Sequence, residues 1–439
     1  MKFRRRTPNL HARSPVLPRR IPPALAGPER EPTVGQSATA ESTSISTPEA
    51  LAPPEITLLR ASIAAIAPVA GEVTVYFYAI LFTRYPQVRD LFPANLDIQR
   101  DRLLRGLLQI VDLIDDPDGL TRFSTRLGRG HRKFGALSGH YPAVGACLLE
   151  SMARFAGPVW TPAMAAAWSH AYGSVAQMMV LAAEADAHRH PATWSAEVIR
   201  HIPRGNGIAE ITIRPHAPYP YLAGQYVSLE TPWHPKAWRY YSPSHAPRPD
   251  ATLTFHVRAI RGGQVSTALV HHAQVGDTVR LGPAEGDMVL NPQMEFDLLC
   301  VAGGTGLAPI RALVEQAART ETGRSVEVFI GARTADELYG LDDMLRMAQR
   351  HHWLSVRAAL SEQHLPGNQG PLPHVLKEFG PWYTHEAFIS GPIEMVASSV
   401  HTLRRRGFPP DRIHHDPFDS PMLDLPRRRS PVQHLREGI

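Results

Sequence analysis

The hydrophobic pattern of this chain changes twice along its length, and these changes restrict the folds available to it. Between residues 55 and 187, apolar side chains recur at helical spacing and glycine is infrequent. From 194 to 291 they alternate with polar ones, whereas beyond 292 short apolar runs precede helical patterns. The sequence therefore predicts a multidomain protein with an all-α unit at 55–187, a linker at 188–193, a six-stranded antiparallel β-barrel at 194–291 and an α/β domain with a parallel sheet at 292–418.

The two ends of the chain differ from this body. Residues 1–54 are rich in Pro, Arg, Ser and Thr and show no apolar period, so we expect a disordered tail. Residues 419–439 are predicted to form a second polar tail. The tails carry the whole net charge of +5, which leaves a neutral interior. A neutral body argues against nucleic-acid binding, which requires a folded basic face.

Composition excludes several further classes of protein. With only two cysteines, Cys147 and Cys300, the chain has no disulfide framework and cannot hold a four-cysteine iron–sulfur cluster. We find no apolar core of a secretory signal and expect no apolar run of membrane-spanning length. The prediction is a soluble, cytoplasmic monomer without stable membrane insertion.

One histidine of the all-α unit stands out by its neighbours. Helices are expected at 55–68, 71–85, 97–114, 119–133, 141–156 and 162–187. Phe123, Leu127 and His131 are four residues apart and share one helix face. A single histidine on such a face is usually packed or solvated, and the chain has 22. Here, however, Phe92 precedes a proline at a helix–helix corner and Gln99 lies four residues before Leu103.

Taken together, these residues resemble the globin domain of the flavohaemoglobin family. The resemblance rests on Tyr76-Phe77-Tyr78, Gln99-Arg100-Asp101 and His140-Tyr141-Pro142, with Tyr141 ten positions after His131. It implies that His131 is the proximal ligand of haem b, with Phe92 against the porphyrin. It also implies a distal set of Tyr78, Gln99 and Leu103 beside bound O₂, and a proximal network that includes Tyr141.

The chain departs from the family pattern at two positions. The glutamate that the family places near the proximal histidine is Ala183 here, and the family's lysine before that histidine is Gly130. Glu184 follows Ala183 but points about 100° away on a regular helix, unless a one-residue bulge turns it back. With alanine at 183, we expect a backbone carbonyl to hold His131.

The barrel region carries features that suit a flavin. Arg239, Tyr240, Tyr241 and Ser242 offer a guanidinium, aromatic rings and a hydroxyl at the end of one predicted strand. After them comes a glycine-rich turn suited to phosphate, formed by Gly262, Gly263, Gln264, Val265 and Ser266. In this order and spacing the two elements resemble the flavin-binding domain of ferredoxin-reductase-like proteins, which implies FAD. Gln225 lies in a segment similar to the family's strand entering the flavin site.

The last domain contains a second glycine-rich turn. An apolar strand run leads into Gly303, Gly304, Thr305 and Gly306, followed by Pro309 and a helix, an arrangement that presents N–H groups to a pyrophosphate. The turn resembles that of ferredoxin-reductase-type nicotinamide domains. Ser390, Gly391 and Pro392 match a second family motif with serine in place of cysteine, and Phe418 matches the aromatic residue that covers the flavin. NADH is favoured as the donor, although Arg333 could hold the 2′-phosphate of NADPH.

The predicted function follows from the three domains in this order. Electrons pass from NADH or NADPH through FAD to the haem, which binds O₂ and oxidises nitric oxide to nitrate. Two alternatives stay open. The protein could be a haem-coupled oxidoreductase with another acceptor, such as peroxide or a quinone, or a globin gas sensor with its own reductase.

Overall fold

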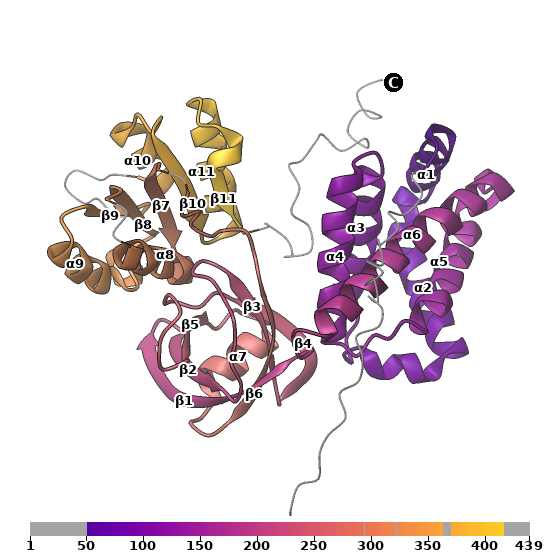
Figure 1. Cartoon of the computed structure of the whole chain (residues 1–439), viewed down its shortest axis with the longest axis horizontal. Coiled ribbons are helices and arrows are strands. Elements are labelled where there is room, and N and C mark those ends of the chain that lie inside the picture. Colours follow the sequence, from indigo (N-terminus) through magenta and orange to yellow (C-terminus); the bar gives the residue numbers. More distant parts are fainter. Residues whose placement is uncertain (1–50, 294, 321–322, 363–369, 417–439) are drawn as a thin grey trace, which may run out of the picture. The chain divides into compact units, whose positions relative to one another are not determined.

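The computed structural model describes residues 51–416 apart from 294, 321–322 and 363–369 (Figure 1). Most of the predicted N-terminal tail, the whole tail at 419–439, and Phe418 lie outside the described residues.

Helices alone make up the first folded part of the chain (Figure 1). Each of the six predicted helices is present and ends within two residues of its predicted limits. Local signals fix their starts: the Asp116 carboxylate accepts from Gly119 N at 3.0 Å, and Thr161 Oγ1 accepts from Met164 N at 3.2 Å, with a proline after each cap. The elements are α1 (Pro53–Ile66), η1 (Ala67–Val69), α2 (Ala70–Arg84), η2 (Pro86–Leu91), α3 (Asp97–Leu113), α4 (Pro117–Arg132), α5 (His140–Ala156), η3 (Gly157–Val159) and α6 (Pro162–Ala187).

These helices enclose one apolar core. Trp168 of α6 is fully buried, and its indole N–H donates to Ser62 Oγ of α1 at 2.7 Å, so the polar edge of the ring is satisfied. The same core contains side chains from the other five α-helices, among them Leu59, Phe77, Leu81, Leu148 and Met152. Packing against such a core, more than intrinsic propensity, stabilises helices of this length.

The expectation that no apolar run reaches membrane-spanning length was wrong. The stretch Pro53–Arg84 passes that test by length and composition, with a mean hydropathy of 1.6. It is interrupted by η1, and Leu59, Ile63, Phe77 and Leu81 from it lie in the helical core. Because core helices of soluble proteins pass the same test, this stretch is weak evidence for a membrane span.

The middle of the chain forms the predicted antiparallel sheet of six strands. Its order is β4-β3-β6-β1-β2-β5, and a bridge between Pro243 and Phe255 links the chain after β4 to β5. Residues 264–266 were predicted as part of a turn, but they begin a helix, α7, because Val265 and Leu269 both pack in the barrel core. The elements are β1 (Trp194–Gly205), β2 (Ile208–Pro215), β3 (Tyr226–Thr231), β4 (His234–Tyr241), β5 (Leu253–Arg258), α7 (Gln264–His271) and β6 (Thr278–Glu285).

The last part is a parallel sheet covered by helices on both faces (Figure 1). Its strand order is β11-β10-β7-β8-β9, as the alternation of strand and helix patterns predicts. The strands are β7 (Asp297–Gly303), β8 (Val326–Ala332), β9 (Leu354–Leu360), β10 (His385–Ser390) and β11 (Ile413–His415). The helical elements are η4 (Gly304–Gly306), α8 (Leu307–Thr320), η5 (Ala335–Glu337), α9 (Leu341–Arg350), α10 (Leu372–Phe379), α11 (Ile393–Arg405) and η6 (Pro410–Arg412).

Strand β7 shows why this sheet reads as continuous apolar sequence. Leu298 and Cys300 lie in the core that includes α8 and α9, whereas Leu299 and Val301 lie in the core that includes α10 and α11. Both faces of the strand are therefore buried, and its carboxyl end leads directly into the Gly303–Gly306 turn.

Candidate functional site

His131 lies in the last turn of α4 and is fixed by the helix itself. Its Nδ1 lies 2.7 Å from the carbonyl oxygen of Leu127, one turn earlier. This contact makes Nδ1 the protonated nitrogen and leaves the lone pair on Nε2. Burial lowers the pKa of His131, which keeps the imidazole neutral at neutral pH. A neutral ring with one nitrogen held and the other available is suited to ligate a metal.

Tyr78 and Gln99 form the polar part of an otherwise apolar region of the helical core. The Tyr78 hydroxyl lies 3.3 Å from the main-chain carbonyl oxygen of Gln99, to which it donates. Its ring meets Phe92 edge-on, with centroids 5.5 Å apart. Burial raises the pKa of Tyr78, so the phenol keeps its proton. Leu103, one turn after Gln99, is partly buried against the same core.

The side chain of Gln99 has an unsatisfied group. Its Oε1 atom is buried and has no hydrogen-bond partner among the described residues. Buried amides are rarely left in this state, because an unmade hydrogen bond costs about 1–3 kcal/mol. The free amide is consistent with a polar ligand beside Tyr78.

Tyr141 is positioned through its backbone. Its carbonyl oxygen accepts a hydrogen bond of 2.8 Å from the hydroxyl of Tyr172 in α6. Burial raises the pKa of the Tyr141 phenol. Within the described part of the chain, no hydrogen bond joins this phenol to His131. The two residues lie on consecutive helices, α4 and α5, without a direct link.

The end of β4 places the four predicted flavin residues in a row. Tyr240 packs edge-on against Tyr226 at 5.5 Å, and Tyr241 against Phe255 at 6.4 Å. Arg239 donates to its neighbour's carbonyl oxygen, that of Trp238, at 2.9 Å. No carboxylate pairs with Arg239 among the described residues, and burial lowers the pKa of its guanidinium. Such a partly desolvated cation is suited to a phosphate.

The glycine-rich segment after β5 is organised by Ser266. Its hydroxyl accepts from Ile260 N at 3.3 Å and donates to the Gly263 carbonyl oxygen at 3.1 Å. Gly262 has a positive φ of 78°, which lets the chain turn sharply into α7. The first N–H groups of α7, from Gln264 onward, have no acceptor within the helix and are directed outward from its start. Ser266 thus shapes the turn.

Gln225 has a local structural role. Its Oε1 accepts from Leu222 N at 2.9 Å, and its Nε2 lies 3.4 Å from the carbonyl oxygen of Gly286, to which it donates. These contacts close the loop before β3 and tie it to the chain after β6.

The second glycine-rich turn lies tightly against the end of β10. Because β7 and β10 are parallel neighbours, with Ala302 opposite Ser390, the two turns meet. A Cβ atom on Gly306 would lie 2.4 Å from the Ser390 carbonyl oxygen, and one on Gly303 would lie 2.9 Å from Pro392 Cδ. Only glycine fits here. Gly304 and Thr305 continue the turn, Gly391 lies close to Gly303, and Pro309 belongs to the first turn of α8.

The sequence of the chain matches three families. Globin matches residues 75–179, the oxidoreductase FAD-binding domain matches 211–289, and the oxidoreductase NAD-binding domain matches 300–401. The flavohemoprotein of Deinococcus radiodurans is 28% identical over 391 residues, which cover 82% of this chain and 96% of that protein. The xylene/toluene monooxygenase electron transfer component of Pseudomonas putida is 31% identical over 235 residues, 52% of this chain and 66% of that protein.

A solved structure shares the arrangement of elements over most of the chain. It is the crystal structure of flavohemoglobin from Malassezia yamatoensis with bound FAD and heme, at a TM-score of 0.72 and 18% identity. The similarity covers 84% of this chain and 100% of that one.

The chain combines a globin with the FAD-binding and NAD-binding domains of an oxidoreductase, and it is similar to flavohemoproteins over most of its length. The predicted family, the three-part fold and the oxidoreductase class are thereby confirmed. A flavohaemoglobin takes haem, FAD and a nicotinamide nucleotide as cofactors. The residues described above fit these groups: His131 offers a free Nε2, Gln99 an unsatisfied Oε1, and Arg239 an unpaired guanidinium.

Among the described residues, no carboxylate lies within salt-bridge distance of His131, whose Nδ1 contacts the Leu127 carbonyl oxygen. Gly128 of α4 packs on the backbone of Met179, and Arg132 pairs with Asp186, so the turn of α6 with Ala183 runs beside His131. Helix α6 is a regular α-helix throughout, and Glu184 is exposed. The bulge that would have returned Glu184 to the site is absent, and the expected backbone carbonyl holds His131 instead.

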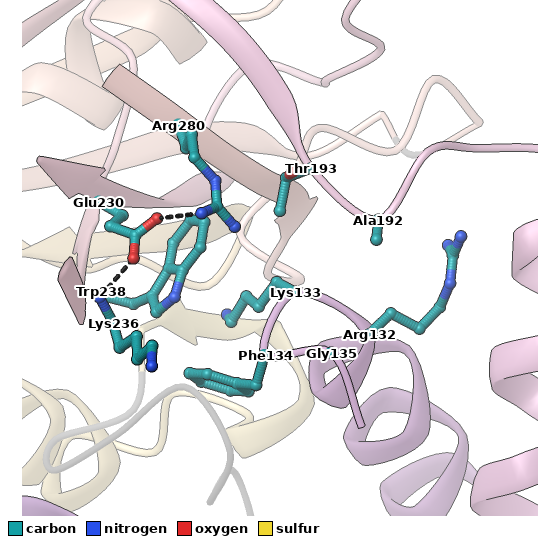
Figure 2. A pocket seen from close by; sticks show the side chains of 10 residues that line it. All are labelled: Arg132, Lys133, Phe134, Gly135, Ala192, Thr193, Glu230, Lys236, Trp238 and Arg280. Atoms are coloured by element: carbon teal, nitrogen blue, oxygen red, sulfur yellow. Dashed lines mark hydrogen bonds and ion pairs between the residues drawn. The ribbon is translucent and has the colours of Figure 1, made fainter. Parts of the chain in front are cut away.

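Lys133 is a candidate residue that sequence reasoning missed. It caps α4, two residues after His131, and is only 4% exposed. Its Nζ donates to Ser228 Oγ at 3.0 Å and lies 3.5 Å from Tyr240 Oη. Lys133, Trp238 and Phe134 line a cavity of about 260 Å³, and Figure 2 shows Lys133 beside the other two side chains. No carboxylate lies within salt-bridge distance of Nζ among the described residues, so this buried cation faces hydroxyls and aromatic rings.

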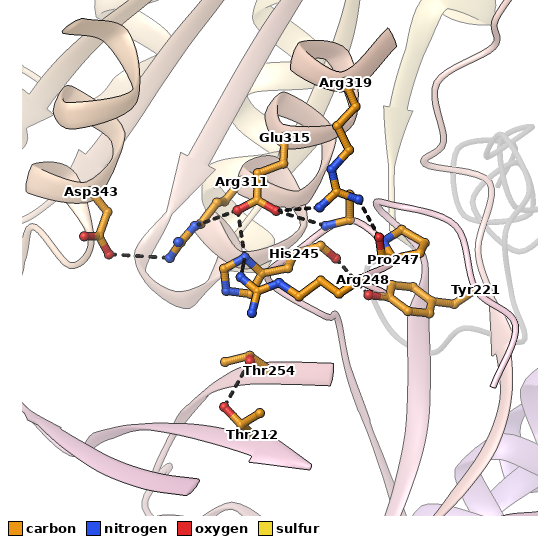
Figure 3. A network of polar contacts seen from close by, with 11 residues as sticks. Thr212, Tyr221, His245, Pro247, Arg248, Thr254, Arg311, Glu315, Arg319 and Asp343 are labelled. Carbon is orange, nitrogen blue, oxygen red and sulfur yellow. Dashed lines mark hydrogen bonds and ion pairs between the residues drawn. The ribbon is translucent and has the colours of Figure 1, made fainter. Parts of the chain in front are cut away.

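A network of charged side chains joins the barrel to α8 (Figure 3). His245 Nδ1 lies 2.7 Å from Glu315 Oε1, and Arg311 Nε lies 3.6 Å from the same carboxylate atom. The Tyr221 hydroxyl donates to the His245 carbonyl oxygen at 3.1 Å. Helix α8 begins directly after the Gly303–Gly306 turn. This network therefore fixes that turn with respect to the loop that follows β4.

Arg258, at the end of β5, was also missed. Its guanidinium lies 3.7 Å from the position that a Cβ on Gly304 would take. It therefore faces the second glycine-rich turn from the barrel side, and it adds positive charge where a pyrophosphate would lie.

Proposed function

We propose that the protein is an NAD(P)H-dependent nitric oxide dioxygenase, which uses O₂ to oxidise nitric oxide to nitrate. Haem and FAD, when bound, supply O₂ binding and the conversion of a two-electron donor into single electrons. One observation carries the proposal: a neutral His131 with a free Nε2 shares the globin with Tyr78 and an unsatisfied Gln99 amide. Residues 55–187, 194–291 and 292–418 are the proposed haem, flavin and nicotinamide domains.

The polar residues of the globin divide the work. His131 is held at Nδ1 by Leu127, and its Nε2 would bind the iron when haem is present. Tyr78 keeps its proton because burial raises its pKa, so its hydroxyl could donate to a partially negative diatomic ligand after turning away from the Gln99 carbonyl oxygen. The Gln99 side chain would add a second donor through its amide Nε2, while its Oε1 is buried without a partner among the described residues. Hydrogen bonds to a charged group of this kind contribute about 1.5–3 kcal/mol each.

The reductase residues bind and orient the two nucleotides. In this proposal, Arg239 and the first N–H groups of α7 would hold the FAD pyrophosphate, and Tyr241 and Ser242 would contact the flavin ring. The turn from Gly303 to Pro309, faced by Arg258, would take the nicotinamide nucleotide. Lys133 extends from the His131 helix to Tyr240, which ties the haem-binding helix to the flavin strand.

Turnover by protein loaded with haem and FAD tests this proposal. We expect sustained, coupled consumption of NADH, O₂ and nitric oxide. Absorbance measures the loss of NADH, and an electrode measures the loss of nitric oxide. The His131→Ala variant should keep FAD and still reduce ferricyanide with NADH. It should bind little haem and no longer consume nitric oxide. A gas sensor would bind nitric oxide or O₂ and stop. An enzyme for another acceptor would consume peroxide or a quinone faster than nitric oxide, and either outcome overturns the proposal.

A further inference from the structure

The side chains at the carboxyl end of β8 would distinguish NADH from NADPH in a bound nicotinamide nucleotide. Strand β8 is the parallel neighbour of β7, with Gly331 opposite Gly303, so its end lies beside the second glycine-rich turn. In doubly wound sheets, the side chains after this second strand contact the ribose 2′ position of the adenosine. Here the strand is followed directly by Arg333 and then by η5.

Arg333 is already engaged by Glu337. Its Nε donates to Glu337 Oε2 at 3.0 Å, a second guanidinium N–H donates to Oε1, and the backbone N–H lies 3.4 Å from Oε2. This is a bidentate pairing, which uses the planar fork that would otherwise grip a phosphate. Pairing raises the pKa of Arg333 and lowers that of Glu337, so both groups stay charged at neutral pH.

Other charges nearby do not restore a phosphate site. Glu362 follows β9, and its backbone N–H donates to the Arg333 carbonyl oxygen at 3.0 Å, which brings a second carboxylate to this edge. The next cation, Arg258, lies toward Gly304, and after Arg333 it also contributes to lowering the pKa of Glu337. The end of β8 therefore holds one occupied arginine and two acids.

We propose that Glu337 makes this site selective for NADH by occupying Arg333 and by offering its carboxylate to the ribose 2′-hydroxyl. A hydroxyl donates to a carboxylate without disturbing the pair. A 2′-phosphate would have to displace Glu337 from Arg333 and would then lie near two uncompensated acids. The inference rests on the proposed nicotinamide site and names the donor that it takes.

Binding of two small probes to the full-length, FAD-loaded protein tests selectivity apart from turnover. The probes are 5′-AMP and adenosine 2′,5′-bisphosphate, which differ only by the 2′-phosphate. The unaltered protein should bind 5′-AMP more tightly. Glu337→Gln should increase affinity for the bisphosphate by about tenfold, as expected when one charge-assisted contact becomes available. Adding Arg333→Ala to that variant should remove the gain.

The matched control is Glu378→Gln, which removes an exposed carboxylate of α10 that pairs with His374; the ratio of the two affinities should not change. Reduction of FAD by NADPH relative to NADH should shift in the same direction as the probes. An unchanged ratio in Glu337→Gln, or tighter bisphosphate binding by the unaltered protein, would overturn the inference. Failure of both probes to bind the unaltered protein would instead overturn the nicotinamide site itself, and with it the proposed function.

Discussion

The Nδ1 atom of His131 lies 2.7 Å from the carbonyl oxygen of Leu127, one turn earlier on the same helix. A carbonyl oxygen is a weaker acceptor than a carboxylate, so it leaves the imidazole less electron-rich. An electron-poor ligand favours ferrous over ferric iron and slows cleavage of the O–O bond in peroxide. This globin should therefore bind O₂ readily and react slowly with peroxide.

Restoring a carboxylate tests this account. Ala183→Glu should lower the haem midpoint potential by roughly 60 mV, which corresponds to a tenfold change in a one-electron equilibrium. The matched change Glu184→Ala should have almost no effect, because that side chain is exposed. Spectroelectrochemical titration of the two variants decides the matter. A raised potential and reduced turnover in Glu184→Ala would show that Glu184 reaches the site after all.

The contact between the Gly303–Gly306 turn and the Ser390–Pro392 segment gives a second prediction. In Gly306→Ala, the new Cβ would lie 2.4 Å from the Ser390 carbonyl oxygen, so the turn must shift. Overpacking of this kind costs about 1–3 kcal/mol, and reduction of FAD by NADH should slow by at least about tenfold. Gly173→Ala in α6 is the matched control, since nothing lies within 4 Å of its Cβ position. Stopped-flow absorbance measures both, and equal rates would contradict the close fit.

A third prediction concerns the buried lysine after the proximal histidine. Lys133→Met removes the hydrogen bond to Ser228 and the cation beside Tyr240, while it fills similar volume. Haem reduction should slow by about tenfold, as expected for loss of orientation between donor and acceptor, while FAD reduction by NADH is unchanged. Lys377→Met, at an exposed position of α10, is the control. Haem reduction at the normal rate in Lys133→Met would show that Lys133 is not needed for electron transfer from FAD to haem.

A buried histidine of the barrel gives a prediction about pH. His256 on β5 has no hydrogen-bond partner on either ring nitrogen among the described residues, and burial lowers its pKa to about 3. The unfolded chain binds this proton near pH 6.5, so the histidine destabilises the fold as pH falls from 6.5 toward 3, by up to about 1.4 kcal/mol per pH unit.

The variant His256→Leu cannot take up that proton. Its melting temperature should fall less between pH 6.5 and 5 than that of the unaltered protein. His374→Gln, an exposed histidine, should behave like the unaltered protein. Parallel pH dependence in His256→Leu and the unaltered protein would show that the ring is hydrated in the fold.

The sequence predicted best what depends on local periodicity. Apolar spacing predicted the six helices, and Asp116 and Thr161 as caps explain why two of their starts are sharp. His131 could be selected because its helix face carries Phe123 and Leu127. The continuous apolar run of β7 likewise indicated a strand buried on both faces.

Long-range contacts were harder to predict. The burial of Lys133 depends on Ser228 and Tyr240, about a hundred residues away, and nothing in its flanking sequence indicates them. The Arg333–Glu337 pair did have a signal, because charges four residues apart often meet, yet the turn that aligns them follows from η5. The glycines at 262 and 263 favour a turn that continues into Gln264, whereas the four-residue spacing of Val265 and Leu269 favours the helix that forms there.

The central claim is that electrons from a nicotinamide nucleotide reach the His131 haem and are used to oxidise nitric oxide. The direct test is the amount of nitrate formed for each NADH oxidised by the haem- and FAD-loaded protein in excess O₂ and nitric oxide. The account predicts about two nitrates per NADH, because the flavin takes a hydride and passes its two electrons singly. A yield near zero while NADH is still consumed would contradict it.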